Sequence, residues 1–131
     1  GRRDGLDNSV LRAIDKTETL TRDNTRGTLA LCFNYGGKAE LVDAVKSIVN
    51  SNIPADEITP EIIAQHVYAP EIPEIDLLIR TSGERRTSGF MMYRSEYAEL
   101  YFTDTMWPDF DESALDTALE DYSSRKRRFG K

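Results

Sequence analysis

Apolar residues recur at helical spacing in several segments of the chain. The pattern predicts helices over residues 8–20, 38–50 and 113–129. The predicted apolar face of the second helix carries Leu41, Val42, Val45, Ile48 and Val49. The segment "TPEIIAQHV" predicts a further short helix, because Thr59 can cap its first turn and Pro60 suits the first helical position.

Three other runs are apolar on both sides and predict strands: "TLALCFNY" at 28–35, "IDLLIR" at 75–80 and "AELYFT" at 98–103. "FMMYR", which precedes the last of these, predicts a turn or a short helix. The alternation of strands and helices predicts an α/β fold with a largely parallel sheet flanked by helices. Ligands of such sheets bind beyond the carboxyl ends of the strands, where "FNYGG" and "RTSGERRTSG" both lie.

Composition narrows the classes of function. Of the 131 residues, 39% are hydrophobic and 31% are charged, as in a soluble globular domain, and the longest apolar runs are too short to span a bilayer. The net charge of −6 argues against a nucleic-acid partner, which requires a broad basic surface, so an anion site has to be local. The single cysteine, Cys32, excludes an internal disulfide, favours a reducing compartment such as the cytoplasm, and is expected to be buried.

The stretch "RTSGERRTSGF", residues 80–90, concentrates positive charge and small polar groups directly after a predicted strand. Glycines let the backbone approach a ligand, arginines donate forked hydrogen bonds to phosphate oxygens, and hydroxyl groups add further donors. The stretch therefore favours a phosphate or diphosphate site. The alternative is a solvated loop whose arginines pair with neighbouring acids, and composition alone leaves both open.

Glu99 stands in an otherwise apolar strand, where a carboxylate needs a cation or a hydrogen-bonding partner. It is therefore either a ligand for magnesium beside a diphosphate or the partner of an arginine in a structural ion pair.

His66, the one histidine, has no partner motif and is assigned a structural role, and a zinc site is excluded. The basic run "RKRRFG" at 125–130 is typical of a solvated helix end.

Three segments resemble the cis-prenyltransferases, the undecaprenyl diphosphate synthase family, in the order that the family shows. They are the 35 residues "DLLIRTSGERRTSGFMMYRSEYAELYFTDTMWPDF" (76–110), "NYGGK" (34–38) and the terminal "RRFG". Family members condense isopentenyl diphosphate with an allylic prenyl diphosphate to give Z-polyprenyl diphosphates, the lipid carriers of cell-wall synthesis among them. They use Mg²⁺ and form homodimers, and they touch membranes at most peripherally, through the lipid product.

The resemblance also implies roles for particular residues. The isopentenyl diphosphate would be held by Arg80, Arg86, Thr87, Ser88, Arg128 and Gly130, the last two reaching across the dimer. Glu99 would be the metal ligand, and no catalytic residue is assigned in this portion. Arginines and magnesium would stabilise the negative charge that develops on the departing diphosphate.

The chain also departs from the family pattern. Gly89 replaces a common asparagine and Tyr93 a common tryptophan, and no "MDGNGRW"-like or "FSSENW"-like segment is present. Residues 1–131 are therefore expected to be the C-terminal portion of one cis-prenyltransferase domain, inactive alone. Two alternatives are a non-catalytic partner subunit of a heteromeric enzyme and a generic phosphate-binding module, the latter disfavoured by the length of the match.

Overall fold

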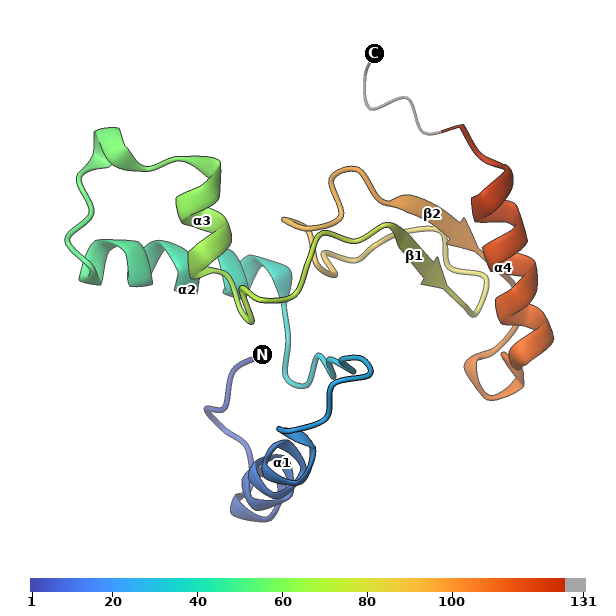
Figure 1. The fold of residues 1–131 in the computed structure, drawn as a ribbon, viewed down its shortest axis with the longest axis horizontal. Coiled ribbons are helices and arrows are strands. Elements are labelled where there is room, and N and C mark those ends of the chain that lie inside the picture. The colour runs from blue at the N-terminus through green and yellow to red at the C-terminus, as the bar shows by residue number, and fades with distance from the viewer. Residues whose placement is uncertain (127–131) are drawn as a thin grey trace.

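The computed structural model describes residues 1–126 of the chain, so the predicted Arg128 and Gly130 lie outside the described residues. Figure 1 shows α2 and α3 on one side of the molecule, the sheet with α4 on the other, and α1 apart from both. The elements in chain order are α1 (Asn8–Thr21), α2 (Gly37–Asn50), a 3₁₀ turn (Ala55–Glu57), α3 (Pro60–His66), β1 (Leu77–Arg80), β2 (Glu99–Phe102), a second 3₁₀ turn (Trp107–Asp109) and α4 (Glu112–Ser124).

The two strands are parallel, which confirms the predicted α/β class. Leu77 of β1 lies opposite Glu99 of β2, and Arg80 lies opposite Phe102. The ladder continues one residue beyond the strands, because Thr103 N–H donates to the carbonyl of Arg80 at 3.0 Å. Helix α4 packs against β2. The hydrogen bonds of this ladder hold the carboxyl end of β1 in place, and the loop of residues 81–90 begins there.

The strand predicted at 28–35 is wrong, because this segment is irregular. A strand exists only where its backbone groups pair with a neighbouring strand, and in the described part of the chain β1 and β2 pair only with each other. Leu29 is 85% exposed and Leu31 77% exposed, so the apolar run also has nothing to pack against. Cys32, predicted to be buried, is exposed for the same reason.

Helix α2 is present as predicted, but its buried side differs from the predicted face. Of the predicted face, Ile48 is buried as expected, but Val42, Val45 and Val49 are exposed, and the other buried positions are Glu40 and Ala44. Helix α2 packs against α3, and the buried Glu40 carboxylate accepts from the Tyr35 hydroxyl, which precedes α2, and from Tyr68 N–H, which follows α3. The buried side of this amphipathic helix therefore includes a hydrogen-bonded carboxylate that the apolar pattern did not include.

The short helix α3 begins as predicted. Thr59 Oγ1 accepts a hydrogen bond from Ile62 N–H at 3.4 Å, and Pro60 occupies the first helical position. His66 Nδ1 lies 2.8 Å from Ser47 Oγ, a contact that joins α3 to α2 and agrees with a structural role for this histidine.

Helix α4 ends earlier than predicted. It ends at Ser124, and the backbone of Arg125 is extended, with φ −79° and ψ 143°. The guanidinium of Arg125 is held by Glu99 Oε2 at 2.9 Å and by the carbonyl of Leu100 at 3.1 Å. The basic run therefore begins with an arginine tied to β2 rather than with a solvated helix end.

The chain exposes more surface than a compact protein of its mass. Its accessible area is 10190 Å², whereas a folded protein of 14.9 kDa exposes about 7,000 Å². Among residues 1–126, no helix is long and apolar enough to cross a membrane. Apolar side chains such as Leu29 and Leu31 are among the exposed residues.

Candidate anion-binding site

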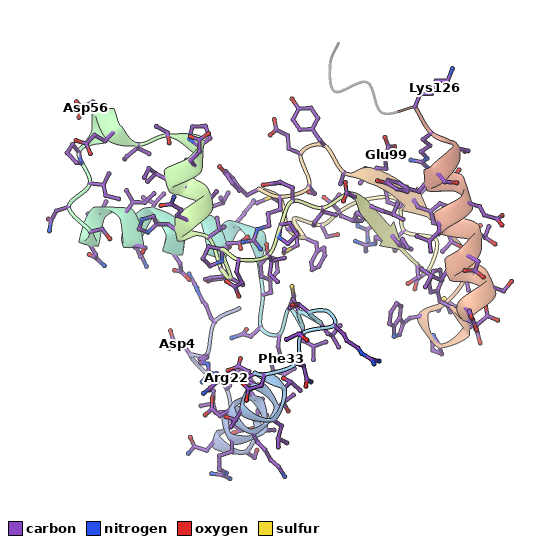
Figure 2. The ribbon with its side chains drawn as sticks, viewed as in Figure 1. Asp4, Arg22, Phe33, Asp56, Glu99 and Lys126 are labelled. Carbon is purple, nitrogen blue, oxygen red and sulfur yellow. The ribbon has the colours of Figure 1, made fainter. Side chains whose placement is uncertain are left out.

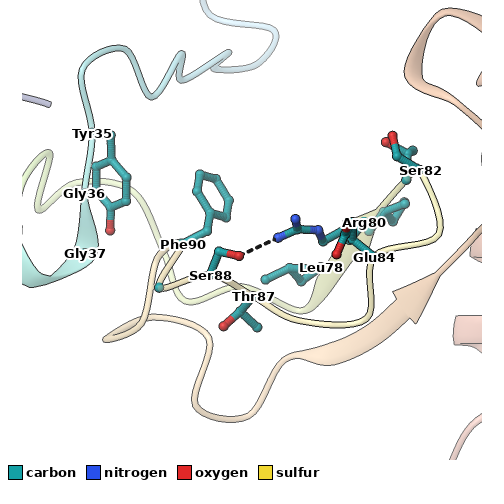
Figure 3. A pocket seen from close by; sticks show the side chains of 13 residues that line it. Tyr35, Gly36, Gly37, Leu78, Arg80, Ser82, Glu84, Thr87, Ser88 and Phe90 are labelled. Carbon is teal, nitrogen blue, oxygen red and sulfur yellow. Dashed lines mark hydrogen bonds between the residues drawn. The ribbon is translucent and has the colours of Figure 1, made fainter.

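A pocket of about 460 Å³ opens beyond the carboxyl end of β1 (Figure 3). Three segments enclose it: the end of β1, the loop that follows, and the first residue of α2 with the two residues before it. Its lining residues are Tyr35, Gly36, Gly37, Leu78, Ile79, Arg80, Thr81, Ser82, Glu84, Thr87, Ser88, Gly89 and Phe90. The two strand-end motifs of the sequence thus meet at one site.

Arg80, the last residue of β1, organises the pocket from its floor. Its Nη1 donates to the backbone carbonyl of Arg86 at 2.8 Å and to Ser88 Oγ at 3.0 Å. Figure 3 shows the second of these bonds, which draws the far side of the loop back toward the strand. The guanidinium group of Arg80 also brings a permanent positive charge to the pocket.

The first part of the loop is fixed by backbone hydrogen bonds. Ser82 N–H donates to the carbonyl of Thr105 at 2.8 Å, and Gly83 N–H donates to that of Thr103 at 2.9 Å. Both residues are left-handed, with φ +71° at Ser82 and φ +72° at Gly83. Ser88 is also left-handed, with φ +51°. Non-glycine residues in this region cost energy and are common where a loop is shaped for a ligand.

The amino end of α2 closes the pocket on the other side. Gly37 is buried, and a Cβ built on it would lie 2.1 Å from the carbonyl oxygen of Gly89. The two backbones can approach this closely only because Gly37 has no side chain. The approach directs the helix amino terminus, with its positive dipole end and unpaired N–H groups, toward the pocket.

Two charged residues of the loop neutralise each other at the pocket edge. Glu84 lines the pocket and forms an ion pair with Arg86, whose side chain is 64% exposed. Exposed pairs of this kind contribute little to stability, so Arg86 can exchange Glu84 for a bound anion at small cost. Both alternatives predicted from the composition of the loop therefore have a counterpart in the structure. Arg86 pairs with an acid, as in a solvated loop, whereas Arg80 lines the pocket, as in an anion site.

Glu99 does not lie at this pocket. As the first residue of β2 it is at the amino end of the sheet, about 10 Å along the strands from Arg80. Its carboxylate accepts a hydrogen bond from Arg125 Nη1 at 2.9 Å, and Figure 2 shows it beside the end of α4. In residues 1–126, no three His, Cys, Asp or Glu side chains gather as a metal site.

The structure brings only part of the predicted set together. Arg80, Thr87 and Ser88 line the pocket, Arg86 does not line it but pairs with the lining residue Glu84, and Glu99 lies elsewhere. Glu84 and Tyr35 also line the pocket, although neither was among the residues predicted for the site. The signals were present, since Glu84 stands among the arginines of the loop and Tyr35 within "NYGGK".

A helix amino terminus, an arginine at a strand's carboxyl end and a glycine-rich loop make this pocket a candidate anion-binding site in an α/β protein. Comparison with known families identifies it further. Residues 1–130 match the prenyltransferase family described as "Putative undecaprenyl diphosphate synthase". The chain belongs to this family.

Relatives and solved structures agree with this membership. The chain is 42% identical to the isoprenyl transferase of Neisseria gonorrhoeae, covering 100% of this chain and 52% of that protein. It is 45% identical to the isoprenyl transferase of Thermotoga maritima, covering 99% of this chain and 57% of that protein. The chain thus spans about half the length of these curated relatives.

Two solved structures match the whole chain. One is lavandulyl diphosphate synthase from Lavandula x intermedia in complex with dimethylallyl diphosphate, with a TM-score of 0.91, 31% identity and coverage of 58% of that protein. The other is a probable undecaprenyl diphosphate synthase from Campylobacter jejuni, with a TM-score of 0.89, 26% identity and 61% coverage. The fold is therefore that of the corresponding part of the diphosphate synthases.

Proposed function

We propose that a protein containing this chain is a cis-prenyltransferase that condenses isopentenyl diphosphate with an allylic diphosphate to give a Z-polyprenyl diphosphate. The observation that carries the proposal is the pocket in which Arg80 faces the amino end of α2. One relative, from Thermobifida fusca, is named a trans,polycis-polyprenyl diphosphate synthase, and one structural neighbour binds dimethylallyl diphosphate. Residues 1–131 form the C-terminal portion of the domain, which agrees with the uncovered apolar surface.

Within this proposal the pocket holds the diphosphate of isopentenyl diphosphate. Arg80 and Ser88 donate to its oxygens, Thr87 adds its hydroxyl and backbone, and Arg86 moves from Glu84 onto the ligand. Because these donors have fixed positions, they would hold the diphosphate in one orientation. A single exposed cysteine agrees with work in the cytoplasm.

Mg²⁺ and a homodimer belong to the same proposal. Magnesium neutralises diphosphate oxygens when it is bound, and Glu99 is the carboxylate that we assign to it. Because Glu99 lies at the opposite end of the strands from the pocket, a second copy of the chain would have to present it there. Arg128 and Gly130, which are proposed to reach the pocket of the second copy, follow Arg125, the partner of Glu99.

The proposal is tested by assaying the longer protein with isopentenyl diphosphate, an allylic primer and Mg²⁺. Formation of Z-polyprenyl diphosphate supports it. A protein that binds inorganic pyrophosphate but yields no product would contradict it and favour a non-catalytic partner subunit.

In the longer protein, Arg86→Ala is expected to raise the KM for isopentenyl diphosphate by roughly ten- to a hundredfold. The reason is that a charge-assisted hydrogen bond contributes about 1.5–3 kcal/mol. The KM for the allylic primer serves as the internal control and is expected to change little. Equal losses for both substrates would indicate that Arg86 only shapes the loop.

Glu99→Gln is expected to raise the Mg²⁺ concentration required for half-maximal activity and to weaken isopentenyl diphosphate binding in parallel. The amide keeps the shape of the side chain but loses the negative charge that a hard dication requires. The matched control is Asp121→Asn, because Asp121 is the other carboxylate paired with Arg125. A thermal melt of each variant accompanies the magnesium titration. A lowered melting temperature with an unchanged magnesium midpoint in Glu99→Gln would assign Glu99 to the ion pair alone.

A further inference from the structure

Tyr35 connects the anion pocket to the buried side of α2. Its hydroxyl donates to Glu40 Oε2 at 2.6 Å and accepts from Met91 N–H at 3.1 Å. Its ring meets the ring of Phe90 edge to face, with centroids 5.8 Å apart. One side chain therefore contacts both the helix and the last residues of the loop. Figure 3 shows Tyr35 on the α2 side of the pocket, with Phe90 beside it.

Glu40 is a fixed anchor for this contact. It is 3% exposed, and its other carboxylate oxygen accepts from Tyr68 N–H at 3.2 Å. A buried carboxylate requires such donors, so the Tyr35 hydroxyl is held in place by a group that cannot easily move. Burial, and then the hydrogen bond to Glu40, raise the pKa of Tyr35, so the hydroxyl keeps its proton at neutral pH.

The part of the loop that Tyr35 holds has an unfavourable backbone conformation. Ser88 and Met91 are left-handed without being glycine, with φ +51° and φ +49°, and Gly89 between them has φ +76°. Such conformations persist only where surrounding contacts impose them. Arg80 imposes the conformation at Ser88, and the Tyr35 hydroxyl binds the N–H of Met91.

We propose that Tyr35 is a positioning residue: through the hydrogen bond from Met91 N–H to its hydroxyl, it holds the loop of residues 87–91 in the form that binds a diphosphate group. This inference rests on the proposed function, since it assumes that the pocket takes a diphosphate. The hydroxyl carries the role, because the ring would remain in contact with Phe90 without it.

The test compares Tyr35→Phe with Tyr93→Phe in the 131-residue chain, with inorganic pyrophosphate as the probe. Tyr93 is the matched control, because its hydroxyl donates to a backbone carbonyl, that of Pro60, at 2.6 Å and it does not line the anion pocket. Binding is measured by calorimetry at a temperature at which circular dichroism shows every variant folded. The amide resonance of Met91 is followed by NMR in the same samples.

Tyr35→Phe is expected to weaken pyrophosphate binding about three- to tenfold, the effect of one hydrogen bond, and to shift the Met91 amide resonance before ligand is added. Tyr93→Phe is expected to change neither. Unchanged affinity in Tyr35→Phe, or equal losses in both variants, would overturn the inference while leaving the proposed function intact. If the unsubstituted chain binds no pyrophosphate, the diphosphate pocket itself is refuted, and the role of Tyr35 with it.

Discussion

Gly37→Ala is expected to destabilise the chain by about 2 kcal/mol and to reduce pyrophosphate binding at least about tenfold. The added Cβ would lie 2.1 Å from the carbonyl oxygen of Gly89, a backbone atom, and 3.1 Å from Met92 Cε. Alanine gains up to about 1 kcal/mol over glycine in helix propensity, but overpacking against backbone costs about 1–3 kcal/mol or more. Because α2 would have to move away from the loop, the pocket loses its helix amino terminus. Chemical denaturation and calorimetry measure the two effects.

Gly27→Ala is the matched control, since it makes the same change at a glycine that does not line the pocket. A Cβ built on Gly27 meets no described atom within 4 Å, and the backbone there is not left-handed. This variant should keep both its stability and its affinity. If the two variants behave alike, the close approach of α2 to the loop does not decide the shape of the pocket.

Arg80→Ala is expected to weaken pyrophosphate binding by about a hundredfold or more. The substitution removes a charged donor from the pocket and also the bonds to the Arg86 carbonyl and Ser88 Oγ that shape the loop. Each charge-assisted contact contributes about 1.5–3 kcal/mol, so the losses combine. Calorimetric titration of the 131-residue chain measures the affinity.

Arg85→Ala controls for net charge, because Arg85 belongs to the same loop but does not line the pocket. It is expected to change the affinity by less than about threefold, as for an exposed charge. Comparable losses in Arg80→Ala and Arg85→Ala would indicate a diffuse attraction to the basic loop instead of a defined site.

Local signals in the sequence predicted most of the elements and the location of the site. The cap at Thr59, the apolar run of β1 and the spacing in α2 each depend on neighbours a few residues away, so all three are readable without tertiary structure. The residue types of the loop after β1 suggested an anion site but left a solvated loop open, and the resemblance to the family favoured the anion site. Its partner motif "NYGGK" was recognised through the family, although Tyr35 itself was not assigned.

The fate of the 28–35 segment and the buried face of α2 depend on which groups meet in space. The apolar run at 28–35 has the composition of a strand, but a strand requires a partner, and Leu31 remains exposed. Helix α2 buries Glu40 rather than Val45, and the buried carboxylate accepts from the Tyr35 hydroxyl and from Tyr68 N–H. Chain pattern alone cannot show such long-range contacts.

Residue types and motifs were enough to predict the α/β class, the family and the loop that is proposed to bind a diphosphate. The tertiary structure decided which of the predicted residues act together. Arg80 and Ser88 join across the loop, Arg86 pairs with Glu84, and Glu99 lies at the opposite end of the parallel strands. The physical reason is that residue type and spacing fix local conformation and charge. The register of two strands and the contact of a side-chain-free glycine with another backbone are set only when distant segments pack.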